Sequence, residues 1–179
     1  MIFLLDMDGV LSDFDKGVRT EWYRRYPGEP LIPEEARQHF FIDDEHPHYA
    51  ERIQDIYRAA GFFIGLLPID GCQSAVRDMQ RLGLELFVCT APLFHSPTCM
   101  REKYDWLAKH FNENFARRMI VTKDKTLVYG DYLIDDRPDV TGVRETPDWE
   151  HILYDRPFNR RINNQRRLTW ANWREVLRL

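Results

Sequence analysis

The sequence predicts an α/β fold, in which helices cover a parallel sheet and a helical segment is inserted after the first strand. Short apolar runs alternate along the chain with segments of helical periodicity, the pattern of a layered α/β domain. The runs are apolar on both faces, as expected of buried parallel strands. Residues 15–67 interrupt this alternation with helical patterns alone.

Five apolar runs are the expected strands of this sheet. The first covers residues 2–5, and the second is the run LELFVC at residues 84–89. The others are residues 119–121, 132–134 and 151–154. Joined through helices, such strands form a Rossmann-like parallel sheet.

Three helices are expected between and after these strands. Residues 72–82 carry Ala75, Val76 and Met79 at helical spacing and stop before Gly83, a residue typical of the turn that ends a helix. The other two cover residues 99–111 and 170–177. We expect two units, an α/β core domain of residues 1–14 and 68–179 and a helical insertion of residues 15–67.

Composition excludes several classes of protein. The 179 residues include 25 Lys and Arg against 29 Asp and Glu, so the net charge of −4 lacks the basic footprint of a nucleic-acid-binding module. No apolar run approaches the roughly 20 residues that span a bilayer. The apolar start is too short for a secretion signal, and three cysteines without CxxC spacing disfavour a disulfide framework. We expect a cytoplasmic protein, monomeric or homodimeric, with neither membrane nor nucleic-acid polymer as partner.

Acidic residues directly follow two of the expected strands. Asp6 and Asp8 come after residues 2–5 and point to the same side, roughly 6.6 Å apart at the spacing of an extended chain, with room for a phosphoryl group or a metal. Gly9 then permits a sharp turn. The plainer alternative is a turn in which an aspartate caps the next helix.

A second acid pair, Asp135 and Asp136, follows residues 132–134. Neighbouring side chains on a strand point oppositely, so one of the two would be a direct ligand and the other would orient it. Carboxylates about 4 Å apart repel by about 4 kcal/mol per pair at an effective dielectric of about 20. A hard cation bound between the carboxylates replaces this repulsion with attraction, and an all-oxygen site suits Mg²⁺. The alternative is that these acids are solvated at a surface.

Thr90 and Lys125 complete a set of polar residues at strand ends. Thr90 follows residues 84–89, and Lys125 lies in the turn after residues 119–121. Because open α/β sheets bind ligands beyond the carboxyl ends of their strands, we expect both to face the crevice that holds the acids.

These motifs resemble those of the haloacid dehalogenase (HAD) superfamily of phosphatases, and most closely the 5′(3′)-deoxyribonucleotidases of cytosolic and mitochondrial type. The four superfamily motifs occur in order: DMDGV at residues 6–10, Thr90, Lys125 and the pair Asp135-Asp136. The resemblance covers nearly the whole chain. It also includes Phe40-Phe41, GFF at 61–63, CTAP at 89–92, EKY at 102–104, DKT at 124–126, LIDDRPD at 133–139, Thr141-Gly142, PDWEH at 147–151 and Trp170.

The resemblance implies a HAD-like fold and a Mg²⁺-dependent nucleotidase that hydrolyses nucleoside monophosphates, deoxypyrimidine forms preferred, through an aspartyl-phosphate. Asp6 would be the nucleophile and Asp8 the general acid and base. Mg²⁺ would be held by Asp6, the backbone carbonyl of Asp8 and Asp136. Asp135 would lie behind these ligands. The residues implied for binding phosphate are Thr90, Ala91, Lys125 and Lys103.

The resemblance also implies that the insertion is a small helical cap over the site. Phe14, Phe40, Phe41 and Phe63 match positions where the family builds an apolar slot for a pyrimidine base, although such residues are more often core. Stacking between rings contributes about 1–3 kcal/mol per base. Two departures bear on the preferred nucleotide: Ala91 stands where relatives often have serine, and Phe41 where some have tryptophan.

Two other functions remain open at this stage. One is a phosphatase of the same superfamily acting on another small phosphomonoester, and the other is a non-catalytic phosphate-binding module. Some polar residues are given a plain interpretation: His46 and His48 as part of a solvated loop, His95 as a surface residue, and residues 159–167 as a solvated surface loop.

Overall fold

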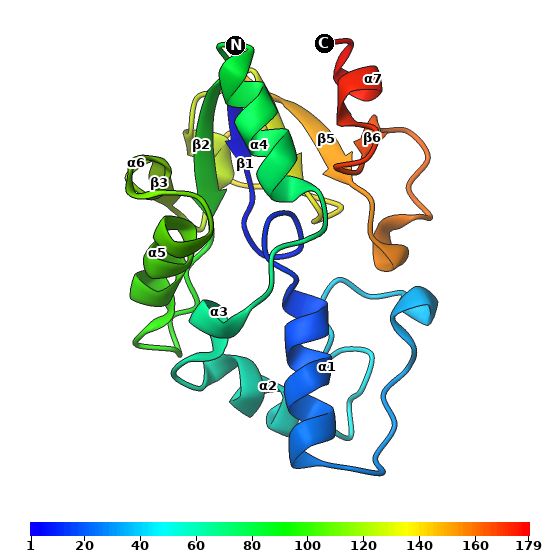
Figure 1. The fold of residues 1–179 in the computed structure, drawn as a ribbon. Coiled ribbons are helices and arrows are strands. Elements are labelled where there is room, and N and C mark those ends of the chain that lie inside the picture. The colour runs from blue at the N-terminus through cyan, green and yellow to red at the C-terminus, as the bar shows by residue number, and fades with distance from the viewer.

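The structure, a computed structural model, describes residues 1–179 and confirms the α/β fold (Figure 1). Its centre is one six-stranded parallel sheet with the strand order β3-β2-β1-β4-β5-β6. The strands are β1 (Ile2–Leu5), β2 (Glu85–Thr90), β3 (Met119–Val121), β4 (Tyr132–Asp135), β5 (Glu150–Tyr154) and β6 (Arg167–Leu168). Because β1 lies between β2 and β4, the residues that end these three strands are neighbours.

All five predicted strands are present, with small shifts at their ends. β2 extends to Thr90 and β4 to Asp135, so these two polar residues belong to the strands rather than to the loops after them. The sixth strand, β6, was not predicted. It is two residues long and pairs Leu168 with Tyr154, which leaves no apolar run to detect.

The helices of the core are α4 (Cys72–Arg81), α5 (Cys99–His110), α6 (Glu113–Ala116) and α7 (Trp173–Leu177). Gly83 adopts a φ of +75° after α4, as its place in the sequence predicted. α7 begins three residues later than predicted, because Trp170 is a buried turn residue whose Nε1 donates to the carbonyl oxygen of Val10 at 2.7 Å.

The helical insertion lies between β1 and α4 and contains no strand. It comprises α1 (Phe14–Arg25), the 3₁₀ turn η1 (Glu34–Ala36), α2 (Ala50–Arg58) and α3 (Phe62–Gly65). Asp13 caps α1 by accepting from the backbone N–H of Lys16. In Figure 1 the insertion lies beyond the end of the sheet toward which the strand arrows point. The carboxyl ends of the strands therefore face the insertion.

No helix of the chain combines the length and apolar character that crossing a membrane requires.

Candidate active site

The loop after β1 brings Asp6 and Gly9 against the end of β4. The backbone N–H of Asp6 donates to the carbonyl oxygen of Ile134 at 2.9 Å, which fixes the first residue of the loop on the neighbouring strand. Gly9 has a φ of +82°, and a Cβ atom there would lie 1.9 Å from Oδ2 of Asp136. Only glycine lets the chain turn at this point and pass so close to the carboxylate.

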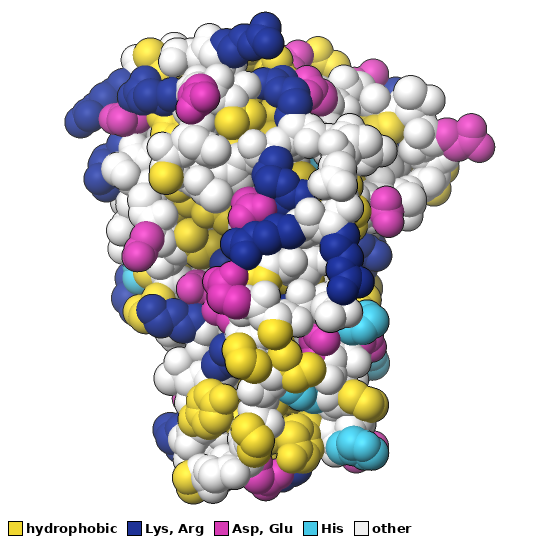
Figure 2. Space-filling view, turned by 90° about the vertical axis from the view of Figure 1, so that its right-hand side faces the viewer, with side chains coloured by type: hydrophobic (Ala, Val, Ile, Leu, Met, Phe, Trp, Pro, Cys, Tyr) yellow, Lys and Arg dark blue, Asp and Glu magenta, His cyan; other side chains and the backbone are white.

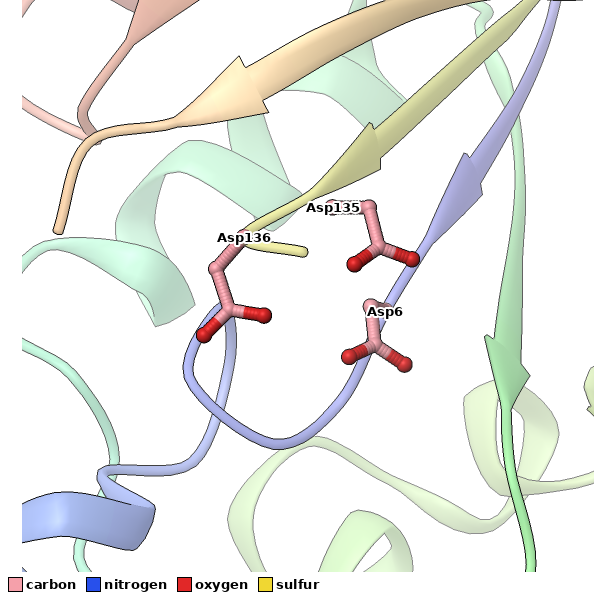
Figure 3. Close-up of side chains that lie close together, drawn as sticks. All are labelled: Asp6, Asp135 and Asp136. Atoms are coloured by element: carbon pink, nitrogen blue, oxygen red, sulfur yellow. The ribbon is translucent and has the colours of Figure 1, made fainter. Parts of the chain in front are cut away.

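Asp6, Asp135 and Asp136 gather three buried carboxylates at the ends of β1 and β4. One oxygen atom from each of the three carboxylates can be chosen so that all three atoms lie within 4.8 Å of one another. Figure 3 shows the side chains around a common space, Asp6 coming from β1 and the other two from β4. The sequence predicted this convergence from the two acid pairs that follow the strands.

Lys125 forms ion pairs with two of these acids. It lies in the 3₁₀ turn η2 (Lys125–Leu127), and its Nζ is 2.6 Å from Oδ1 of Asp6 and 2.6 Å from Oδ2 of Asp135. The other oxygen of Asp135 accepts from the backbone N–H of Arg137 at 2.9 Å. Asp135 is thus fully hydrogen-bonded within the chain, whereas the side chain of Asp136 has a buried Oδ1 without a partner.

The pKa values of this cluster reflect its excess of negative charge. Burial raises the pKa of Asp6 to about 6, against the lowering effect of Lys125 and with a further rise from Asp135 and Asp8. Burial, Asp135 and Asp6 raise the pKa of Asp136 well above its usual range. Burial lowers the pKa of Lys125, but the two carboxylates it contacts more than offset this and keep the lysine charged.

The donor set fits a hard divalent cation such as Mg²⁺. It offers carboxylate oxygens close together, and the Oδ1 of Asp136 is a buried acceptor that no group of the chain satisfies. Both oxygens of Asp135 accept hydrogen bonds, one from Lys125 and one from the backbone N–H of Arg137. Its position therefore suits orienting the residues that would bind the cation.

Asp8 lies in a separate ion pair beside the acid cluster. Its Oδ2 is 2.7 Å from Nζ of Lys103, a buried lysine on α5, and its Oδ1 accepts from the hydroxyl of Ser12 at 3.1 Å. The same Nζ donates to Oγ1 of Thr90 at 2.8 Å and to the carbonyl oxygen of Ala91 at 2.9 Å. Asp6 and Asp8 thus have different lysine partners, and Lys103 joins Asp8 to the end of β2.

A cavity of about 290 Å³ opens over these residues toward the insertion. Figure 2, which shows one face of the molecule, has charged side chains across its middle and hydrophobic ones gathered on its lower part, at the height of the insertion. The cavity has charged groups at the strand ends and aromatic rings from the insertion. The predicted site residues all line it: Asp6, Asp8, Phe14, Phe40, Phe41, Phe63, Thr90, Ala91, Lys103, Lys125, Asp135 and Asp136.

The four phenylalanines differ in how far they are free to contact a ligand. Phe63 is 2% exposed, and Phe41 is 52% exposed. The ring of Phe14 packs on Tyr57 at 5.6 Å between centroids, and Phe40 meets Phe41 edge-on at 5.0 Å. All four line the cavity, where aromatic rings suit contact with a flat apolar group.

Sequence reasoning missed several residues that build the site. Asn159 is fully buried, and its Nδ2 donates to the carbonyl oxygens of Asp136 and Tyr154, at 2.8 Å each. This corrects the interpretation of residues 159–167 as a solvated loop: the run begins at this buried asparagine and ends in β6. Others that no spacing signals are Asp15, Arg37, Tyr57, Arg137 and Phe158, which line the cavity.

The interpretation of His46 is also corrected. The residue is 8% exposed, and its Nε2 accepts from the backbone N–H of Ile32 at 3.3 Å, so it packs the insertion instead of lying in a solvated loop. His48 and His95 are exposed. All five tryptophans are buried.

Comparison with known proteins places this geometry among nucleotidases. Residues 1–179 match the model of the family described as "5' nucleotidase, deoxy (Pyrimidine), cytosolic type C protein". The chain is 44% identical to the human 5'(3')-deoxyribonucleotidase, cytosolic type, over 97% of its own length and 92% of that protein. It is 39% identical to the human mitochondrial 5'(3')-deoxyribonucleotidase, over 97% and 81% respectively.

The fold is also shared with solved structures of low sequence similarity. A HAD family hydrolase from Deinococcus radiodurans, solved with bound phosphate and sodium, superposes with a TM-score of 0.59 at 13% identity. The match covers 98% of this chain and 94% of that one. The HAD-like architecture predicted from the motifs is therefore confirmed.

Proposed function

The chain belongs to the cytosolic type C family of deoxy(pyrimidine) 5′-nucleotidases, and from this premise we propose that it hydrolyses nucleoside monophosphates as a 5′(3′)-deoxyribonucleotidase, with deoxypyrimidine nucleotides preferred. One observation carries the proposal. A single cavity is lined both by buried acids with two lysines and by four phenylalanines, a combination that suits a phosphate joined to a flat base.

Asp6 is the proposed nucleophile. Lys125 holds its Oδ1, and the side chain keeps 12% of its surface accessible in the cavity. An oxygen of Asp6 attacks phosphorus in line, so that an Asp6–phosphorus bond forms as the bond to the nucleoside oxygen breaks. Asp8 gives that oxygen a proton, then takes one from the water that attacks phosphorus and releases Asp6 and phosphate.

The phosphate oxygens face the lysines and the end of β2. Lys125 and Lys103 supply positive charge, while Thr90 and the backbone of Ala91 supply hydrogen-bond donors. Lys103 contacts Asp8 and Thr90 in the free protein, so a phosphate would enter an existing set of hydrogen bonds.

Mg²⁺ is the proposed cofactor. Asp6, Asp136 and the backbone carbonyl of Asp8 would hold it, with Asp135 orienting this set through Lys125. When bound, the ion supplies the positive charge that lets an anionic nucleophile approach an anionic phosphate. The unsatisfied Oδ1 of Asp136 and the raised pKa values of Asp6 and Asp136 support the assignment.

We assign residues 15–67 as the cap and residues 1–14 with 68–179 as the core. The cap would keep water from the reacting phosphate and present Phe40, Phe41 and Phe63 to the base, beside Phe14 at the end of the first core segment. A cytoplasmic location and a monomeric or homodimeric state are part of the proposal, and the name of the human cytosolic relative supports the location.

The decisive experiment measures phosphate release from ribo- and deoxyribonucleoside monophosphates and from sugar phosphates, with Mg²⁺ and with EDTA. Deoxypyrimidine nucleotides should be hydrolysed fastest, and EDTA should abolish release. The Asp6→Asn variant should lose at least about 1,000-fold in kcat, because its amide is a poor nucleophile. Asp44→Asn, at an exposed position of the insertion, is the matched control and should retain wild-type activity.

Two outcomes would contradict the proposal. Faster hydrolysis of sugar phosphates than of any nucleotide would favour a phosphatase of another small phosphomonoester. Wild-type turnover by Asp6→Asn would remove Asp6 as nucleophile.

A further inference from the structure

Arg37 is a buried cation in the insertion that none of the proposed catalytic roles uses. It is 4% exposed and lines the cavity beside Phe40. Its Nη1 pairs with the buried carboxylate of Asp15. Its Nη2 donates to the carbonyl oxygens of His39 and Phe40, at 2.8 and 2.7 Å. Removing a charge from water costs free energy, so buried charges are normally paired, as Arg37 is with Asp15. The same side chain also binds two consecutive backbone carbonyls.

Those two carbonyls belong to a segment without regular structure. Residues 38–44 contain no helix or strand, so no helix or sheet ladder fixes the backbone that carries Phe40 and Phe41. Hydrogen bonds with side chains fix this backbone instead. Glu45 accepts from the backbone N–H groups of Gln38 and His39, and Arg37 binds the carbonyls from the cavity side.

Arg37 in turn takes its position from the core. Arg156 precedes the 3₁₀ turn η3 (Pro157–Asn159), and its Nη2 lies 3.3 Å from Oδ2 of Asp15, the partner of Arg37. The guanidinium of Arg37 lies 4.7 Å from the centroid of the Phe158 ring, which meets Phe40 edge-on at 5.6 Å. The next residue, Asn159, binds the carbonyl of Asp136.

One short core segment, residues 156–159, therefore contacts both the acid cluster, at Asp136, and the insertion, at Asp15 and Phe40. We propose that Arg37 is a positioning residue for the nucleobase: it fixes the Phe40–Phe41 wall and, through Asp15 and Phe158, sets the distance of this wall from the acid cluster. The inference rests on the proposed function, since it assigns Phe40 and Phe41 to the base. The planar fork of arginine places one nitrogen, Nη1, on Asp15 and another, Nη2, on the two carbonyls. The single nitrogen of a lysine cannot occupy both positions.

The test compares Arg37→Lys with Arg52→Lys in the full-length protein. Arg52 is the matched control, because it also lies in the insertion, pairs with an acid (Glu29, at 2.7 and 2.9 Å) and lies over aromatic rings, yet it does not line the cavity. Arg37→Lys keeps a charge for Asp15, so the protein should fold. Arg37→Met would leave Asp15 without this partner and is a second variant of lower stability.

Two substrates separate the base from the phosphate. For deoxythymidine 5′-monophosphate, Arg37→Lys should raise KM about tenfold, within the range that stacking on an aromatic ring contributes, and should change kcat less than about twofold. For deoxyribose 5-phosphate, which has no base, kcat/KM should be unchanged. Arg52→Lys should alter neither substrate.

Hydrogen exchange supplies a readout that does not depend on turnover. The backbone amides of residues 38–44 should exchange faster in Arg37→Lys than in the wild type, and at the wild-type rate in Arg52→Lys. Equal losses for both substrates, or unchanged KM and exchange, would overturn the role of Arg37. A wild-type enzyme that gains nothing from the base would instead overturn the proposed nucleotidase function, and this control is measured in the same experiment.

Discussion

Asp136, a proposed metal ligand, works against the stability of the fold. Its carboxylate is buried, its Oδ1 has no hydrogen-bond partner, and Asp6 and Asp135 lie within 4.8 Å. Lys125 forms ion pairs with the other two acids but does not contact Asp136. An ionised carboxylate in this place destabilises the protein unless a cation joins it.

We therefore expect Asp136→Asn to stabilise the metal-free protein while removing its response to Mg²⁺. Because burial raises the pKa of Asp136 above the unfolded value of about 3.8, this destabilisation is absent below pH 3.8 and grows as the pH rises from there toward the raised pKa. In EDTA the gain should be on the order of 1–3 kcal/mol at pH 7.5 and should shrink toward pH 4.5. Urea unfolding at both pH values measures it.

The control for this prediction is Asp44→Asn, which replaces an exposed acid and should change stability by less than about 0.5 kcal/mol. Added Mg²⁺ should raise the Tm of the wild type and of this control, but not that of Asp136→Asn. A metal-free Asp136→Asn protein less stable than the wild type at pH 7.5 would show that the ionised carboxylate is satisfied.

Among the elements, the turn η3 after β5 has an effect larger than its three residues suggest. It follows Arg156, which reaches Asp15 of the insertion, and it contains Asn159, which binds the carbonyl of Asp136. Asn159 also receives a hydrogen bond on its Oδ1 from the backbone N–H of Arg156 at 3.1 Å. Hydrogen bonds thereby hold this short turn, and through Asn159 the turn holds the backbone at Asp136.

Asn159→Ala should weaken both stability and metal binding. It leaves the buried carbonyls of Asp136 and Tyr154 without their donor, which costs about 2–4 kcal/mol for the pair. The Mg²⁺ concentration that gives half of the thermal stabilisation should rise severalfold, because the backbone of Asp136 is no longer fixed. Asn163→Ala, an exposed asparagine nearby in the chain, is the control. Equal behaviour of the two variants would contradict this role.

At the scale of the whole molecule, the insertion and the sheet share one apolar core. Val18, Trp22 and Ile53 of the insertion belong to the same buried cluster as Leu5 and Ile134 of the strands. Glu102 on α5 also links the sheet domain to the insertion. Its carboxylate accepts hydrogen bonds from the backbone N–H groups of Gly61 and Phe63, at 2.8 and 3.0 Å. The cap and the core that we assign are thus joined by packing as well as by the chain.

This continuity predicts a single cooperative unfolding transition in the absence of ligand. Far-UV circular dichroism, which reports all helices and strands, and tryptophan fluorescence, to which Trp22 of the insertion contributes, should give the same midpoint in urea. Earlier melting of the insertion, seen as faster hydrogen exchange over residues 15–67 than over the sheet, would show that the two units unfold separately.

Much of this architecture follows from local patterns. The runs at residues 2–5 and 119–121 coincide with β1 and β3, since a buried strand is recognisable from its own apolar residues. β6 was not predicted, because a strand of two residues is too short to show an apolar or alternating pattern. The acids of the site were found because strand ends meet at one edge of a parallel sheet, so their position in the chain implies their position in space.

The sequence by itself determined the α/β class, the insertion, the acid cluster with Lys125 and the family resemblance, because each depends on residues close together in the chain or on the order of motifs. Only the tertiary structure decided that Asp8 pairs with Lys103, that Asn159 supports Asp136 and that Arg37 binds the backbone at Phe40. These contacts join residues whose types fit a solvated surface equally well. Their partners are chosen by packing and by the need to satisfy buried polar groups, and neither leaves a periodic trace in the sequence.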